Sequence, residues 1–499
     1  MIAAQQKPGW LRSLQVTLLV CFLAFFTGIL SVEIVARGTK IMIAGIGGLT
    51  GLAMILLAWP LGQARNLVLF GIAFALSVDF SKSFALHVFT EGQYVQNVGG
   101  AAGLTISAVF LGAVVLLVLR WVEGRAIQAP WPYILPWAAF ACVGMVTLPT
   151  AVDPSLVVWE LIRIAMLLVI LLAMANIDPD ELRRFLIFTA VAVGCQGAIA
   201  TAQYVTGGTL GLSFLGEQDL QVESIGFEAV SRATGTIGNP NILAYYFELL
   251  LPPLLALGLA RKDAVGFPAA VVRLILLGAL LAGLAGLGLT LSRAGWLTMG
   301  LILPCVFVVI AGRALLTRPG ILLLVVLLLI VVAVCTYIAP AVLERMFGDD
   351  GGSLAQRGPL NRGAWELISG APLFGIGLNN FGPAFAILDT TGAARVFTNV
   401  NHVVHNMYLL VAAETGFVGL AAFITIFALA LRRALRLYRT AGSPMISSLG
   451  LGIAAGIVAQ LVHGLIDPGF RLSLSISQLI FVLLGLLAAC ETFSKEESK

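Results

Sequence analysis

The chain has 499 residues, of which 59% are hydrophobic and 11% are charged, and its formal net charge is +4. Soluble domains carry roughly a quarter charged residues, so the composition excludes an ordinary soluble globular protein. The small positive excess is explained by basic residues in short loops between apolar segments, and it gives no reason to expect a nucleic-acid partner.

Segments of about 20 apolar residues recur along the chain, and each is long enough to cross a bilayer as a helix. Lipid cannot satisfy free backbone groups, and the apolar runs are continuous rather than alternating, so helices are expected rather than a barrel. The predicted fold class is all-α, a polytopic integral membrane protein with about 12–14 transmembrane helices and a long periplasmic loop that carries short interfacial helices. The predicted spans are 14–32, 41–59, 66–80, 103–120, 131–148, 158–176, 185–205, 242–260, 273–291, 295–312, 320–340, 406–431, 446–466 and 472–490.

The predicted organisation has two parts, with N-terminal transmembrane helices at 1–205 and a second region at 206–499. The second region contains long loops at 206–241 and 341–405. Basic residues concentrate in the short cytoplasmic loops of membrane proteins. If both termini are cytoplasmic, the long loops lie outside and many basic residues of the short loops lie inside, among them Arg120, Arg125, Arg183, Arg184, Arg432, Arg433, Arg436 and Arg439.

The first long loop ends in Thr234-Gly235-Thr236-Ile237-Gly238-Asn239-Pro240-Asn241. Asn239 or Asn241 can cap the helix that follows, with Pro240 in its first turn. In the alternative interpretation, free N–H groups at the helix start face an anion at the outer surface.

Three arginines are predicted on the same outer side. Arg357 and Arg362 accompany a short interfacial helix around Trp365, and Arg293 lies in the tight turn between spans 273–291 and 295–312. Interfacial arginines commonly bind lipid phosphates or extend from a span toward water. The planar guanidinium also suits bidentate binding of a diphosphate.

His405 follows the second long loop and precedes an apolar segment from Met407 to Leu429. An interfacial histidine is often only a hydrogen-bonded polar residue, but a titratable imidazole at the end of a membrane helix is well placed for proton abstraction at the membrane surface. Glu414 follows His405 by nine residues, so at about 1.5 Å per residue it is expected roughly 13 Å from the imidazole along the helix axis. This distance is too long for Glu414 to orient His405. His402 is expected in the loop.

Two further pairs of polar residues follow from helical spacing. Glu160 and Arg163 are one turn apart and are expected to pair. His463 and Asp467, also one turn apart, are expected at the outer end of a span, on the same side as His405.

These segments together resemble the O-antigen ligase and polymerase superfamily of bacterial envelope glycosyltransferases. The matching pieces are Thr234–Asn241, Ser292-Arg293, Arg357 to Gly377 with Pro372-Leu373-Phe374-Gly375-Ile376-Gly377, and His405-Asn406-Met407-Tyr408-Leu409 followed by Glu414-Thr415-Gly416. The resemblance covers roughly residues 230–470 and assigns 206–499 to an O-antigen ligase-like transmembrane region. Asn361, where an aromatic residue is more usual, and the additional Arg362 depart from the pattern.

The resemblance implies a multi-pass enzyme of the bacterial inner membrane with its active site on the periplasmic side. Such an enzyme transfers a glycan from undecaprenyl diphosphate to a glycan or lipid A-core acceptor, without a metal or other cofactor and with inversion. His405 would be the catalytic base. Arg357, Arg293, Arg362 and Asn406 would bind the diphosphate and the glycan, and the principal diphosphate-binding residue is left open between Arg357 and Arg362.

Three functions remain as alternatives. An O-antigen ligase, which the sequence favours weakly, would use lipid A-core as acceptor, whereas a repeat-unit polymerase would use a second lipid-linked glycan. A polysaccharide-related transporter is the alternative from another class, since Glu248 and Glu414 lie within predicted spans. The polar residues concentrate at the outer ends of the spans rather than at their middle, which favours an enzyme.

Overall fold

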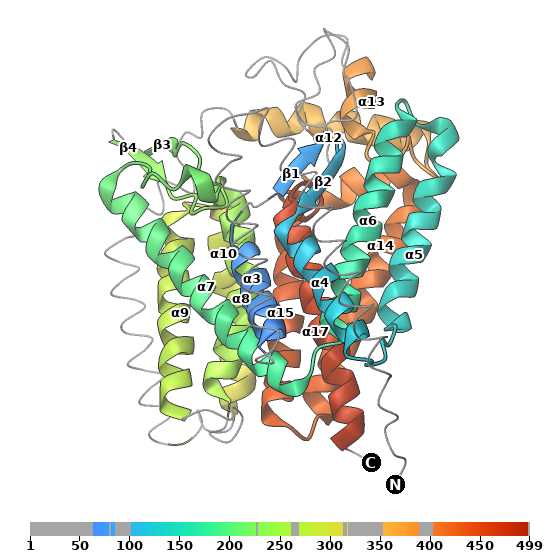
Figure 1. The fold of residues 1–499 in the computed structure, drawn as a ribbon. Coiled ribbons are helices and arrows are strands. Elements are labelled where there is room, and N and C mark those ends of the chain that lie inside the picture. Colours follow the sequence, from blue (N-terminus) through green and yellow to red (C-terminus); the bar gives the residue numbers. More distant parts are fainter. Residues whose placement is uncertain are drawn as a thin grey trace, which may run out of the picture.

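A computed structural model describes residues 63–78, 81–84, 101–225, 228–260, 269–312, 317, 353–388 and 403–497. Within these ranges the chain is a bundle of helices with short loops at one end and longer loops at the other (Figure 1). The predicted spans 14–32, 41–59 and 320–340, as well as His402, lie outside the described residues.

The prediction of an all-α polytopic membrane protein is confirmed. In the described part of the chain, nine helices are long and apolar enough to cross a membrane, and α3 and α4 are shorter apolar helices. The helices before residue 207 are α3 (Ala64–Ala75), α4 (Ala108–Val122), α5 (Trp131–Val146), α6 (Pro154–Ala175) and α7 (Pro179–Thr206). The later long helices are α8 (Pro240–Leu259), α9 (Ala269–Leu289), α10 (Arg293–Ala311), α14 (Met407–Thr440), α15 (Pro444–His463) and α17 (Leu474–Glu497).

The helix starts follow local sequence signals. Asp178 and Glu181 form a capping box at the start of α7, which has Pro179 in its first turn. Asn239 caps α8 and Ser292 caps α10 through side-chain oxygens that accept backbone N–H groups. These caps satisfy N–H groups that a helix start would otherwise leave unpaired near the lipid interface.

The bundle joins segments from both parts of the sequence. α17 packs against α6, and α7 packs against α9, while α8 contacts α9, α10 and α15. Aromatic rings fill the space between α5, α14 and α17, where Trp137 lies 4.6 Å from Phe481 between ring centroids and 6.2 Å from Phe427. α8 and α17 are the most buried of the nine long helices.

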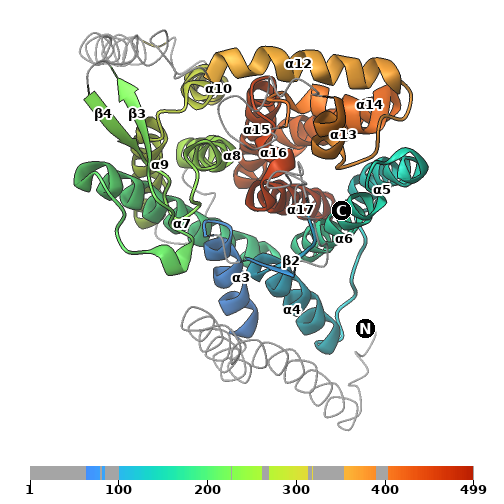
Figure 2. The ribbon, with the colours of Figure 1, turned by 90° about the horizontal axis from the view of Figure 1, so that it is seen from above.

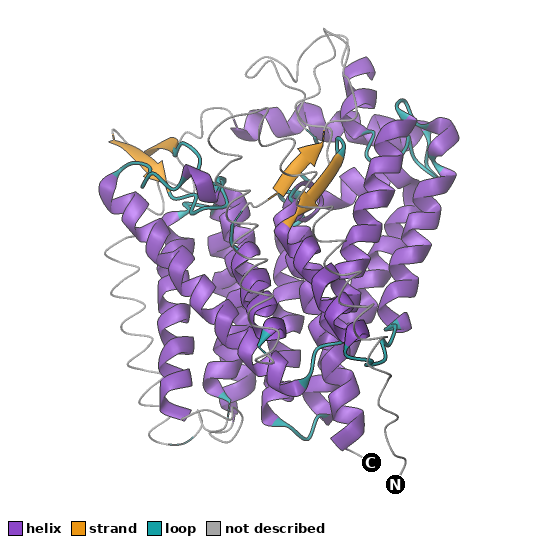
Figure 3. Cartoon of the chain, in the orientation of Figure 1, coloured by secondary structure: helices purple, strands orange, loops and turns teal. Residues whose placement is uncertain are grey.

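One end of the bundle carries the long loops, and we call it the loop face. It bears α12 (Ser353–Gly370), α13 (Phe381–Leu388) and two small β-hairpins (Figure 3). The sequence predicts short helices in the long loop but not the hairpins. Strands β1 (Ser81–Phe84) and β2 (Leu104–Ser107) pair antiparallel, as do β3 (Gln221–Ile225) and β4 (Glu228–Arg232). Seen from above, α12 runs along one edge of the bundle between α10 and α14 (Figure 2).

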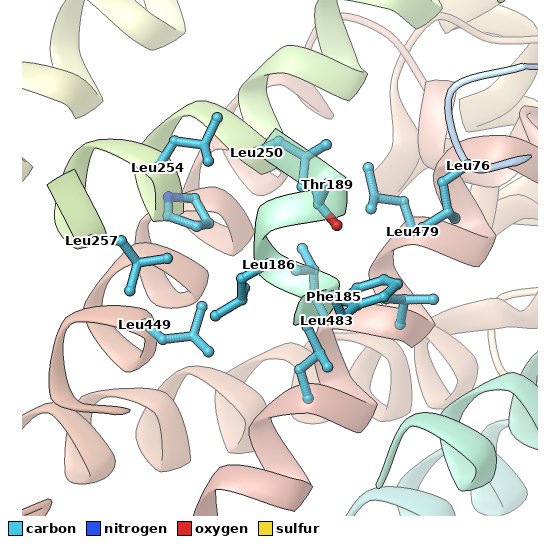
Figure 4. Close-up of a pocket in the computed structure, with 13 residues that line it drawn as sticks. Leu76, Phe185, Leu186, Thr189, Leu250, Leu254, Leu257, Leu449, Leu479 and Leu483 are labelled. Carbon is cyan, nitrogen blue, oxygen red and sulfur yellow. The ribbon is translucent and has the colours of Figure 1, made fainter. Parts of the chain in front are cut away.

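An apolar pocket lies toward the opposite end from the loop face (Figure 4). It is lined by the later turns of α8, the first turns of α15, and parts of α7 and α17, including Leu254, Leu449 and Leu483. Thr189 is the one lining residue with a polar side chain. None of the predicted site residues lines this pocket.

Candidate functional site at the loop face

His405 lies at the loop face, immediately before α14. Its side chain is 32% exposed, and its Nδ1 lies 3.6 Å from Oδ2 of Asp467, which is 15% exposed. This separation is longer than a hydrogen bond, but catalytic contacts in an unliganded enzyme are often long and shorten on binding. The Asp467 carboxylate faces the Nδ1 edge of the His405 ring.

Asn406 fixes the backbone next to His405. Its Oδ1 accepts the N–H groups of Tyr408 and Leu409 at 2.9 and 3.0 Å, which makes it the N-cap of α14. Its Nδ2 donates to the carbonyl of Leu465 at 3.0 Å. The amide therefore supports the protein's own backbone, and a role of Asn406 in substrate binding stays a prediction.

The two arginines of α12 occupy opposite sides of that helix. The buried residues Leu360, Ala364 and Ile368 mark the side that packs on α14. Arg357 precedes Leu360 by three residues and lies on the same side, whereas Arg362 is exposed on the other side.

Arg293 is the first residue of α10, directly after its cap Ser292. The preceding Leu291 has a φ of +51°, a left-handed conformation that side chains other than glycine seldom adopt. Arg232, buried beside this turn, donates from Nε to the Thr290 carbonyl at 2.9 Å and from Nη2 to Asn241 Oδ1 at 2.8 Å. Arg232 thus fixes the turn that presents Arg293, a role that the sequence analysis missed.

The start of α8 matches the capping interpretation. Asn239 Oδ1 accepts the N–H groups of Asn241 and Ile242 at 2.9 and 3.2 Å. Because these donors are already paired, the alternative in which they face an anion is not supported.

Glu414 has a different partner from His405, as expected from its depth in α14. Its Oε2 accepts a hydrogen bond from Arg471 Nη2 at 2.8 Å, and Arg471 Nη1 also pairs with Glu160. The predicted pair of Glu160 and Arg163 is confirmed at 2.6 Å. Arg471, in the short helix α16 (Gly469–Leu472), joins the two carboxylates, and no spacing signal in the sequence connects it to either.

The segment 371–378 is held by the backbone of α14. The carbonyls of Ala413 and Glu414 accept the N–H groups of Ile376 and Gly377, and the N–H of Phe417 donates to the Pro372 carbonyl at 2.8 Å. This exchange occurs where Gly416 interrupts α14 with φ +66° and ψ −173°. The Pro372–Gly377 run is therefore a structural connection between α12 and α14.

Comparison with known proteins shows what this region is similar to. Residues 277–424 match a family described as O-antigen ligase. No curated protein matches the chain. A solved chain, from work on structural coordination of polymerization and crosslinking by a peptidoglycan synthase complex, shares 20% identity. That alignment covers 73% of the present chain and 98% of the solved one, with a TM-score of 0.38.

The family match spans α10, α12, α13 and the first half of α14, and so includes Arg293, Arg357, Arg362, His405 and Asn406. The resemblance of this membrane protein to the O-antigen ligase-like superfamily is therefore confirmed over residues 277–424.

Proposed function

We propose that this membrane enzyme transfers a glycan from undecaprenyl diphosphate to an acceptor sugar hydroxyl, with lipid A-core as the acceptor. The observation that carries the proposal is the partly exposed imidazole of His405 beside the Asp467 carboxylate, 3.6 Å away, on the end of the bundle that bears α12. The family match to residues 277–424 supports glycan transfer as the class of reaction.

In the proposed reaction, Nε2 of His405 takes the proton of the acceptor hydroxyl. The acceptor oxygen attacks the anomeric carbon, and the bond from that carbon to the diphosphate oxygen breaks. The electron pair leaves with undecaprenyl diphosphate. Because attack and departure occur on opposite faces of the sugar, the anomeric configuration inverts.

Asp467 orients the imidazole and stabilises the positive charge that it gains. A carboxylate has the same function beside the histidine of hydrolytic triads. General-base catalysis by a positioned side chain contributes about 10²–10⁴-fold to a rate.

Arg357 is the better placed of the two α12 arginines for the diphosphate. It lies on the same side of α12 as Leu360 and Ala364, which pack in one cluster with Val403 and Val404, next to His405. Arg293 would provide a second guanidinium from the start of α10. Charge-assisted, bidentate contacts to phosphate would stabilise the negative charge that develops on the leaving group.

The decisive experiment is transfer by the purified protein in detergent, with a defined undecaprenyl-linked donor. Lipid A-core and a second lipid-linked glycan are offered as separate acceptors. Transfer to lipid A-core supports the ligase, whereas transfer only to the second lipid-linked glycan identifies a polymerase. Movement of donor across proteoliposomes without any conversion would instead identify a transporter.

His405→Ala is expected to reduce transfer by at least about 100-fold while the protein still purifies as a folded species. His402→Ala is the matched control, since it changes a nearby histidine that is expected to lie in the loop, and it should retain most of the activity. Full activity of His405→Ala would remove this imidazole from the mechanism.

A further inference from the structure

Asp467 lies in the segment that connects α15 to α16, here called the 463–469 turn. The start of α14 contacts this turn from one side. Met407 N–H donates to the Gly464 carbonyl at 2.8 Å, and Asn406 Nδ2 donates to the Leu465 carbonyl. The turn and His405 are thus connected through the backbone as well as through the Asp467 side chain.

Tyr245 of α8 contacts the 463–469 turn at three points. Its hydroxyl donates to the backbone carbonyl of Asp467. Its ring stacks on His463, with centroids 3.9 Å apart and an interplanar angle of 15°. The ring edge meets Gly469 so closely that a Cβ there would lie 2.2 Å from Tyr245 Cε2. Tyr245 is fully buried, so these contacts determine where the turn lies.

A second buried pair holds the stacked histidine. His463 Nδ1 lies 2.7 Å from Glu248 Oε1, one turn further along α8 from Tyr245, and the two side chains are 1% and 0% exposed. Gln460 Nε2 donates to the other Glu248 oxygen at 3.3 Å. Ionisable groups buried within a membrane protein are costly, and hydrogen bonds among buried polar side chains hold those side chains in one arrangement. Here that arrangement determines the plane against which Tyr245 stacks.

We propose that Tyr245 is a positioning residue for the His405–Asp467 pair, and that Glu248 and His463 hold Tyr245 in place. The inference rests on the proposed function of His405 as the base. The contact of Tyr245 with this pair is the hydrogen bond from its hydroxyl to the backbone carbonyl of Asp467. Tyr245 acts through the backbone of Asp467 and so determines how the carboxylate meets His405 Nδ1.

Tyr245→Phe tests this directly, because it removes the hydroxyl and keeps the buried ring. A displacement of about 1 Å in a catalytic group can lower a rate by about 100-fold. The loss of one positioning hydrogen bond is therefore expected to lower kcat by about ten-fold. The KM for the lipid-linked donor should stay within about two-fold of the unaltered value, since Arg357 and Arg293 are unchanged.

Tyr246→Phe is the matched control. Tyr246 is the next residue of α8 and is equally buried, but its hydroxyl has no hydrogen-bond partner among the described residues, in the 463–469 turn or elsewhere. This variant should keep the unaltered kcat. Gly469→Ala approaches the same contact from the other side and should reproduce the Tyr245→Phe defect, because the added methyl group must displace the ring.

A double-mutant cycle separates positioning from general destabilisation. If Tyr245 acts through the Asp467 carboxylate, Tyr245→Phe should change kcat by less than about two-fold in an Asp467→Ala background. Multiplicative effects of the two changes would overturn the inference, as would an unaltered kcat for Tyr245→Phe.

The same assay distinguishes this inference from the proposed function. If His405→Ala loses transfer while Tyr245→Phe and Gly469→Ala keep it, the function stands and the positioning role is wrong. Absence of transfer by the unaltered protein, or full activity of His405→Ala, would overturn the proposed function and this inference together.

Discussion

At the scale of single residues, helix geometry separates two arginines that the sequence alone left equivalent. Arg357 and Arg362 are five residues apart in the sequence, which places them on different sides of an α-helix. The packed side of α12 is marked by Leu360, Ala364 and Ile368, and Arg357 belongs to it. Arg362 is exposed on the other side.

Replacing each arginine with lysine should therefore give different results. Hydrogen bonds to charged groups contribute about 1.5–3 kcal/mol, and lysine cannot form the bidentate contact. Because one such hydrogen bond would be lost, Arg357→Lys is expected to lower kcat/KM for the lipid-linked donor by about 10- to 100-fold. Arg362→Lys, an exposed charge, should change it by less than about three-fold. Steady-state transfer assays check both, and a larger loss for Arg362→Lys would reverse the assignment.

The site could be predicted from the sequence only in part. His405 can be selected as a candidate from the sequence, because a titratable residue directly before a long apolar segment is conspicuous there. Asp467 was placed on the same side, but its contact with His405 depends on how α14 meets the end of α15. The roles of Arg232, Tyr245 and Arg471 could not be predicted, because their partners are remote in sequence and no periodic pattern connects them.

At the scale of elements, the described spans agree with the predicted ones to within a few residues at most ends, because continuous apolar runs directly report lipid-crossing helices. The interruption of α14 was not predicted. Gly416 has dihedral angles that are nearly exclusive to glycine, and a Cβ there would lie 2.2 Å from the Leu373 backbone. A single glycine in an apolar run gives no sign of such a break, because transmembrane helices commonly contain glycine.

Gly416→Ala should consequently destabilise the folded protein severely. Backbone strain in this region costs about 1–3 kcal/mol, and the contact with the 371–378 segment adds to it. Gly300→Ala in α10 is the matched control, since its added Cβ would meet no atom within 4 Å. Thermal unfolding in detergent should show a large loss of stability for the first variant and none for the second. Equal melting temperatures would mean that the break in α14 tolerates a side chain.

The loop after α7 is organised around one carboxylate. Burial opposes ionisation of Glu217, but hydrogen bonds from Gln203 Nε2 and from the N–H groups of Leu210 and Leu212 hold the pKa of its carboxyl below the ordinary value. Gln203 in turn accepts the N–H of Gly235 at 2.8 Å. Glu217 therefore connects the 207–217 loop to the segment that leads into α8.

A lowered pKa in the folded state means that ionised Glu217 stabilises this loop above the unfolded pKa, about 4.3. The stabilisation is lost as the pH falls through the lower, folded pKa. Hydrogen exchange at Leu210 and Leu212 should remain slow at neutral pH and become faster only in strong acid. Glu217→Gln should show faster exchange already at neutral pH. Equal protection of the two proteins at neutral pH would exclude this role.

At the scale of the whole molecule, the candidate site and a concentration of basic residues in short loops lie at opposite ends of the bundle. The loop face carries α12, α13 and the segments around His405, while the ends of α4 and α14 and the start of α7 lie at the other end (Figure 1). Those helix ends bear Arg120, Arg183, Arg184 and the arginines from 432 to 439. Positively charged short loops mark the cytoplasmic side of membrane proteins, so the loop face is expected in the periplasm.

Cysteine labelling tests this orientation, on which access to a donor in the outer leaflet depends. In a variant without the native cysteines, Ser369→Cys introduces a thiol on the exposed side of α12, and Thr440→Cys introduces one at the far end of α14. A membrane-impermeant maleimide added to spheroplasts should label the first thiol at once and the second only after permeabilisation. The two positions are each exposed, so a difference in labelling reports the side of the membrane rather than burial. The reverse pattern would place His405 in the cytoplasm, where a periplasmic donor could not reach it.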